Sequence, residues 1–137
     1  MSNDNTRDAA EPSLASAGSI PAFRYESLRE MPTLVRVLTN EHKAWVVGGA
    51  AKWMCGVGPR PRDWDVIVPE SEWPAASKHF PYGSQVNTMG GIKATSDGCE
   101  VDVWASDLGW HWISSYGEFD LLAVSPRTQQ VSICTKR

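Results

Sequence analysis

Two closely spaced aspartates are the residues of this chain best suited to chemistry. Asp63 and Asp65 open the apolar segment DWDVIV at 63–68. Successive side chains of a β-strand point to opposite faces, so a strand here places both carboxylates on one side and Trp64 on the other. Two carboxylates so placed can share a divalent cation. An isolated Asp-x-Asp pair more commonly marks a turn or a solvated strand end, and that interpretation stays open.

A glycine pair upstream of these acids is suited to an anion. Gly48 and Gly49 follow the apolar run WVV at 45–47. Because glycine has no Cβ, backbone N–H groups at a helix start can approach a phosphate closely. In the proline-extended loop before Asp63, Arg62 either contacts phosphate or balances the nearby acids. A glycine pair alone most often forms only a turn.

This order of strand, Gly-Gly turn, short helix and Asp-x-Asp strand resembles the nucleotidyltransferase superfamily, which has a polymerase-β-like palm. It is most similar to the head domain of poly(A) polymerases and CCA-adding tRNA nucleotidyltransferases, in a minimal single-domain form. The similarity extends over about residues 45–104. It implies an α+β fold, with a mixed β-sheet and helices packed mainly on one face. It also implies a third acid on a later strand, and Asp102, between Val101 and Val103, matches that position.

The resemblance assigns Asp63, Asp65 and Asp102 as both catalytic residues and metal ligands. Three adjacent carboxylates repel one another unless a cation neutralises them, and oxygen-only ligands suit Mg²⁺ or Mn²⁺ better than zinc. In the implied mechanism two ions orient a triphosphate and polarise an attacking hydroxyl, with Asp102 as a ligand and candidate general base. Displacement at the α-phosphorus then releases pyrophosphate.

The helix after the glycine pair both follows and departs from the family pattern. CCA-adding enzymes usually have Arg-Asp where this chain has Lys52-Trp53, so the positive charge is kept and the acid is replaced. Lys52 either reaches the triphosphate or lies on a solvated helix face. The predicted nucleotide- or phosphate-binding residues are therefore Gly48, Gly49, Lys52 and Arg62.

The implied function is metal-dependent transfer of a nucleoside monophosphate from an NTP to a hydroxyl acceptor. The acceptor is an RNA 3′ end, a protein or a small molecule, and a partner protein is a candidate for completing the site. The alternative is a non-catalytic regulatory or antagonist module that binds a nucleotide or a protein. Seven tryptophans favour that alternative, because tryptophan supplies large interface anchors. Three mutually repelling acids favour catalysis.

Composition sets the broad class. With 137 residues and 42% hydrophobic content, the chain has room for one domain with a real core. A net charge of −3 lacks the basic excess typical of tight nucleic-acid binding. Three cysteines without a C-x-x-C pair, no apolar run of about 20 residues and no signal-like start predict a cytoplasmic protein without a membrane partner.

Residues 1–22 are polar and aperiodic, so we expect a disordered tail before a minimal nucleotidyltransferase domain over 23–137. Apolar residues at three- and four-residue spacing predict a helix over 25–42, whose start is ambiguous between a capping box at Ser27 and Pro32. Other patterns predict helices over 50–55 and 70–79, hairpins over 84–95 and 119–134, and a short helix or irregular segment over 107–115.

Overall fold

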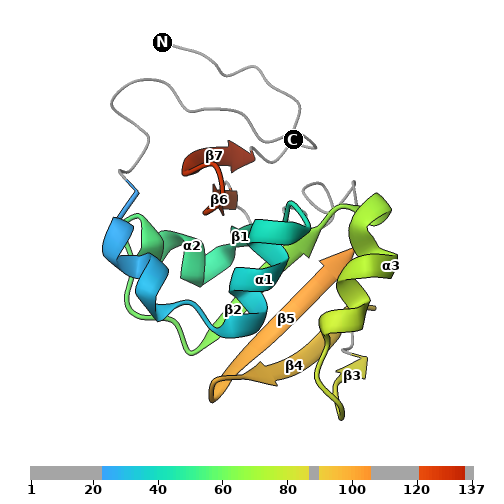
Figure 1. Cartoon of the computed structure of the whole chain (residues 1–137). Helices are drawn as coiled ribbons and strands as arrows, with labels where there is room; N and C mark the ends of the chain where they lie inside the picture. The colour runs from blue at the N-terminus through green and yellow to red at the C-terminus, as the bar shows by residue number, and fades with distance from the viewer. Residues whose placement is uncertain (1–22, 87–89, 106–120, 135–137) are drawn as a thin grey trace.

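A mixed β-sheet forms the centre of the molecule (Figure 1). The computed structural model describes residues 23–86, 90–105 and 121–134. Within these ranges seven strands pair in the order β3-β4-β5-β2-β1-β6-β7. β2 and β5 are parallel and every other neighbouring pair is antiparallel. The strands are β1 (Trp45–Val47), β2 (Asp63–Val68), β3 (Gln85–Val86), β4 (Ile92–Ser96), β5 (Cys99–Ala105), β6 (Leu121–Ser125) and β7 (Gln130–Cys134).

The helices pack on one face of this sheet, which confirms the α+β prediction (Figure 1). The α-helices contribute buried side chains to the same cluster as the strands, whereas two of the three short 3₁₀ helices contribute none. They are α1 (Thr33–Glu41), α2 (Gly48–Met54) and α3 (Trp73–Ala76), with the 3₁₀ helices η1 (Tyr25–Glu30), η2 (Glu70–Glu72) and η3 (Ser77–His79). The predicted helix over 70–79 is therefore present as three short consecutive turns.

The single helix expected over 25–42 is wrong, because the chain breaks at Pro32. Met31 is extended, with φ −67° and ψ 132°, and α1 begins only after Pro32. A proline ring clashes with a helical residue before it and drives that residue to extended geometry. Of the two starts that the sequence left open, the proline start belongs to α1.

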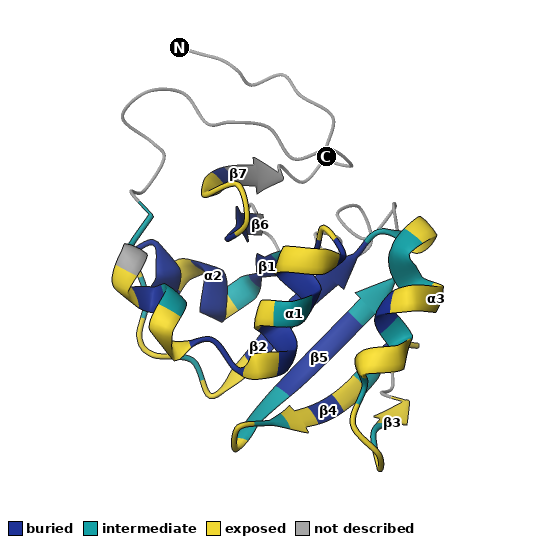
Figure 2. Cartoon of the chain, in the orientation of Figure 1, coloured by how far each residue is buried: buried dark blue, intermediate teal, exposed yellow. Residues whose placement is uncertain are grey.

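Alternation along β2 and β5 separates an apolar face from an acidic one. The face toward the helices is buried (Figure 2) and carries Trp64, Val66, Val68, Val101 and Val103. Because side chains alternate, the intervening acids of the same strands point to the opposite face. The core therefore fixes which side of the sheet carries the carboxylates.

The β4–β5 turn holds the start of α1. Asp97 and Gly98 form the two-residue turn, with φ of 53° and 80°, as type I′ hairpins require. The Thr33 backbone N–H and hydroxyl donate to Asp97 Oδ2 at 2.6 and 2.7 Å. The Leu34 N–H donates to Ser96 Oγ at 3.0 Å. The hairpin thus supplies acceptors for the first helical N–H groups, which no side chain within α1 provides.

The C-terminal hairpin is confirmed, since β6 and β7 pair antiparallel from Leu121 and Cys134 to Ser125 and Gln130. The expectations for residues 1–22 and 107–115 lie outside the described residues. None of the described helices has the length and apolar character needed to cross a membrane.

We expect Asp97→Ala to lower the thermal midpoint by a few degrees, because it removes two acceptor bonds and places alanine at positive φ. Asp97→Asn is the control, because asparagine tolerates this φ and keeps an acceptor oxygen, and it should lower the thermal midpoint by less. These hydrogen bonds to Thr33 lower the Asp97 pKa below 3.8. The stabilisation is therefore full at neutral pH and declines as pH falls below that value. Equal midpoints for both variants would contradict the capping role.

Candidate metal and nucleotide site

The register between β2 and β5 brings the acids together. In this parallel pair Asp63 lies beside Glu100 and Asp65 beside Asp102. Residues paired across neighbouring strands point to the same face of the sheet. Two strands that are 30 or more residues apart in sequence therefore present four carboxylates on one face.

Three of these carboxylates lie within reach of one ion. Ligand oxygens of Asp63, Glu100 and Asp102 all lie within 4.8 Å of one another. Glu100 was not among the residues predicted from the sequence, although the alternation that places Asp63 with Asp65 also places Glu100 with Asp102. Asp65 is not in this group. Its carboxylate lies on the same face but is turned toward Gly48.

Burial and mutual repulsion raise the pKa of two of the acids. The pKa of Asp65 is raised to about 7, first by burial and then by the charges of Asp63, Asp102 and Glu100. The pKa of Asp102 is raised to about 6 by burial and by the charge and hydrogen bond of Glu100. Lys93 opposes this second shift from β4, and its Nζ lies 3.5 Å from Glu100 Oε2. One lysine leaves the cluster strongly negative, so a divalent cation would relieve repulsion that the protein itself does not.

Gly48 is packed directly against the acids. The antiparallel pairing of β1 with β2 sets Val47 beside Asp65, so the chain bends into α2 at the level of that carboxylate. Gly48 has φ +70°, and a Cβ added there would lie 3.0 Å from Asp65 Oδ2. A Cβ on Gly49 would meet nothing within 4 Å. The two glycines therefore differ: the absence of a Cβ at Gly48 makes room for the Asp65 carboxylate, whereas Gly49 borders open space.

An open cleft of about 470 Å³ adjoins Asp63. It lies between α2 and the loop before β2, so it joins the end of the acidic cluster to exposed basic side chains. Four predicted site residues line it, namely Gly49, Lys52, Arg62 and Asp63. The cleft therefore places basic side chains beside one end of the carboxylate cluster.

Trp53, at the position where the resemblance to CCA-adding enzymes would place an acid, is part of the core. It is 7% exposed and packs edge to face on Trp64, with ring centroids 6.0 Å apart. The guanidinium groups of Arg24 and Arg60 lie 5.5 and 5.2 Å from its ring centroid. Arg60 also pairs with Glu30. Arg60 is therefore anchored, whereas Arg62 has no ion pair within the described part of the chain.

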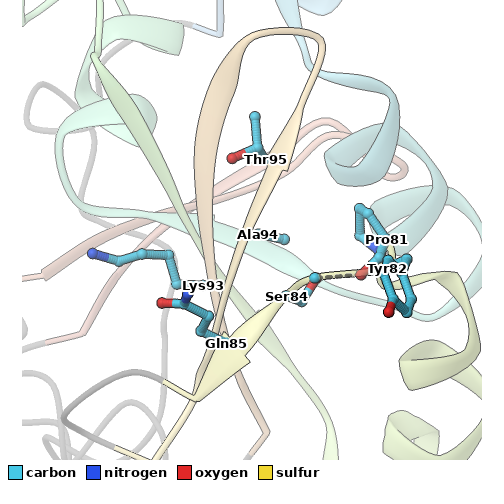
Figure 3. A pocket seen from close by; sticks show the side chains of 8 residues that line it. Pro81, Tyr82, Ser84, Gln85, Lys93, Ala94 and Thr95 are labelled. Carbon is cyan, nitrogen blue, oxygen red and sulfur yellow. Dashed lines mark hydrogen bonds between the residues drawn. The ribbon is translucent and has the colours of Figure 1, made fainter.

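A second hollow, of about 260 Å³, lies between residues 81–85 and β4 (Figure 3). Lys93 and Tyr82 are its only ionisable lining residues, and Figure 3 shows them well apart from each other. Since Lys93 already pairs with Glu100, this hollow offers little free charge for a nucleotide.

One comparison with known proteins finds a similar fold. No family model matches the chain, and no curated protein matches it. A solved complex of a CCA-adding enzyme with CTP superposes on 85% of this chain with a TM-score of 0.54 and 15% sequence identity. The chain has the nucleotidyltransferase fold. The match spans 32% of the CCA-adding enzyme chain, so this chain corresponds to about a third of that protein.

Within the nucleotidyltransferase fold, the two glycines should respond differently to alanine. Gly48→Ala places a Cβ 3.0 Å from a carboxylate oxygen at a backbone φ that disfavours alanine, so we expect a loss of roughly 1–3 kcal/mol in unfolding free energy. Gly49→Ala is the matched control and should change stability by less than about 1 kcal/mol, since its Cβ has room. Urea denaturation measures both. Equal losses would contradict the close approach of Gly48 to Asp65.

Asp65→Asn should stabilise the metal-free protein. Because the folded pKa of about 7 exceeds the ordinary 3.8, ionising Asp65 costs stability as pH rises from about 4 to 7. We expect the variant to gain roughly 4 kcal/mol at pH 8, at about 1.4 kcal/mol for each pKa unit, and little at pH 4. Denaturation in EDTA at both pH values measures this gain, and Mg²⁺ should reduce it by stabilising the wild type. A variant less stable than wild type at pH 8 without metal would contradict the proposed repulsion.

Proposed function

We propose that this chain is a metal-dependent nucleotidyltransferase, which transfers a nucleoside monophosphate from an NTP to a hydroxyl acceptor and releases pyrophosphate. The observation that carries the proposal is the acidic face of β2 and β5 beside the Gly48 bend, on a nucleotidyltransferase fold. The acceptor is an RNA end, a protein hydroxyl or a small molecule.

Asp63, Asp65 and Asp102 are the proposed metal ligands, with Glu100 as an additional acid that the structure places among them. The donor set contains only carboxylate oxygens, which fits Mg²⁺ or Mn²⁺. A bound ion of this kind supplies charge stabilisation to the reacting phosphate and lowers the pKa of an attacking hydroxyl.

The chain's own residues then position the nucleotide and handle the proton. Lys52 and Arg62 neutralise the triphosphate in the cleft beside Asp63, while the open space at Gly49 admits it close to the backbone. Asp102 accepts the proton of the acceptor hydroxyl. That oxygen bonds to the α-phosphorus as the bond to the β-phosphate oxygen breaks.

A binding module remains the second candidate, because one family feature is absent. Trp53 fills the position of an acid with a buried aromatic ring, so any catalytic contribution of that acid is lost. In this reading the cleft holds a nucleotide or its phosphates without turnover. Nucleotide binding that persists without product distinguishes this candidate from the enzyme.

The test of transfer is incubation with each labelled NTP, Mg²⁺ or Mn²⁺, small RNAs and cell extract, which also supplies any partner chain. We expect Asp65→Asn and Asp102→Asn to reduce transfer about a hundredfold or more, because metal-bound charge stabilisation is worth several kcal/mol. Asp97→Asn is the matched control, because Asp97 lies in the β4–β5 turn, bonds to Thr33 and is outside the acidic group, so this variant should retain transfer. Unchanged transfer in Asp65→Asn would contradict the proposed chemistry, and wild-type binding without labelled product would favour the binding module.

A further inference from the structure

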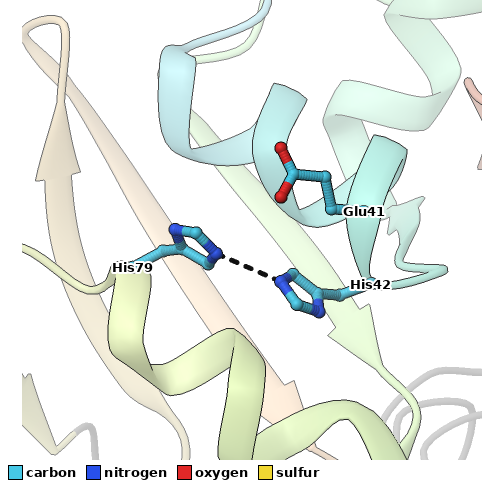
Figure 4. Close-up of side chains that lie close together, drawn as sticks. All are labelled: Glu41, His42 and His79. Atoms are coloured by element: carbon cyan, nitrogen blue, oxygen red, sulfur yellow. Dashed lines mark hydrogen bonds between the residues drawn. The ribbon is translucent and has the colours of Figure 1, made fainter.

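A second group of metal-binding side chains lies at the C-terminal end of α1. Glu41 and His42 come from this end, and His79 comes from η3 (Figure 4). One ligand atom of each lies within 4.8 Å of the others. Both helical segments belong to the layer that covers the apolar face of the sheet, whereas the acids of β2 and β5 point to the opposite face. This histidine cluster is therefore separate from the proposed catalytic site.

His42 is oriented by a carboxylate from another element. Its ring is buried, and Nδ1 lies 3.1 Å from Glu72 Oε1. A carboxylate can only accept, so Nδ1 carries the proton and donates it to Glu72. In the neutral ring the lone pair is then on Nε2. Protein metal sites commonly have this arrangement, in which a carboxylate on one histidine nitrogen directs the other toward the ion.

The two histidines face each other through the atoms that would bind metal. His42 Nε2 accepts a hydrogen bond from His79 Nε2–H at 3.1 Å, a proton that an ion between the rings would replace, and Figure 4 shows the rings turned toward each other. Two zinc–nitrogen bonds of about 2.0–2.1 Å at a tetrahedral angle place the nitrogens about 3.3 Å apart. An ion can therefore bridge them with a small shift, and the exposed ring of His79 can make that shift.

We propose that Glu41, His42 and His79 bind a zinc ion, with water as the fourth ligand. Two imidazole nitrogens and one carboxylate oxygen form a donor set that suits Zn²⁺ and does not suit Mg²⁺. The ion joins the end of α1 to η3, two segments that are 37 residues apart at the histidines. Its role is structural, because it cross-links two parts of the helical layer and leaves the carboxylate face free.

The test uses the full chain, stripped with EDTA and titrated with Zn²⁺ in excess Mg²⁺, so that the oxygen-only site is occupied. We expect one equivalent to bind, the Nε2 resonances of two histidines to shift in ring ¹H–¹⁵N spectra, and the thermal midpoint to rise by several degrees. His79→Gln should abolish both the zinc-induced change in the histidine resonances and the rise in the thermal midpoint. Glu41→Gln should weaken zinc binding. Glu72→Ala should weaken binding about 10–100-fold by releasing His42.

Lys78→Gln is the matched control, because Lys78 is the exposed neighbour of His79 in η3 and should leave zinc binding unchanged. Unshifted histidine resonances with wild-type protein at saturating Zn²⁺ would overturn the proposal. So would zinc binding that survives His79→Gln and is lost in Asp102→Asn, since the ion would then occupy the carboxylates. Neither result would count against the proposed nucleotidyl transfer, because the residues proposed for transfer lie on the opposite face of the sheet and are tested separately.

Discussion

The parallel pairing of β2 with β5 is the constraint on which the rest of the molecule depends. It sets Asp65 beside Asp102 and Asp63 beside Glu100, and it buries the valines of both strands under the helices. A shift of either strand by one residue would exchange its two faces and turn its two carboxylates toward the core. Burial of the valines fixes the register and so also holds the four carboxylates close together. Their mutual repulsion lowers the free energy of unfolding, and a bound cation would reduce that repulsion.

The elements around this pair act as supports. Pairing of β1 with β2 places Gly48 next to Asp65. The β4–β5 turn caps the start of α1 through Asp97. The same hairpin carries Lys93, which lies near Glu100 and offsets part of the cluster's charge. Helix position and site charge are thus linked through one hairpin, so a change in its turn affects the helical layer as well as the strand that bears two acids.

Much of this arrangement was predictable because it follows from local patterns. Alternation in β2 and the apolar flanks of Asp102 predicted these strands, and the family resemblance that they carry with the glycine pair implied the fold class; the structure confirms both. Glu100 was not predicted, because the resemblance implies a single acid on that strand, although the alternation that places Asp102 on this face also places Glu100 there. The break at Pro32 was also visible in the sequence. The assignment of Asp63, Asp65 and Asp102 as metal ligands stays a prediction.

Other features have no local signal. The parallel neighbour of β2 lies beyond two further strands in sequence, and the cluster of His42 with His79 forms only when α1 and η3 meet in space. The pairing of Arg60 with Glu30 likewise follows from tertiary contact, and it leaves Arg62 as the predicted phosphate contact of that loop.

The perpendicular contact between Trp53 and Trp64 has an optical consequence. Two indoles with centroids 6.0 Å apart and planes at 84° are close enough for their electronic transitions to couple, giving a near-ultraviolet circular dichroism signal. Trp64 stands between the two aspartates of β2 and shares their backbone. The circular dichroism of this pair therefore reports, in the unlabelled protein, on the packing of the core face behind the carboxylates.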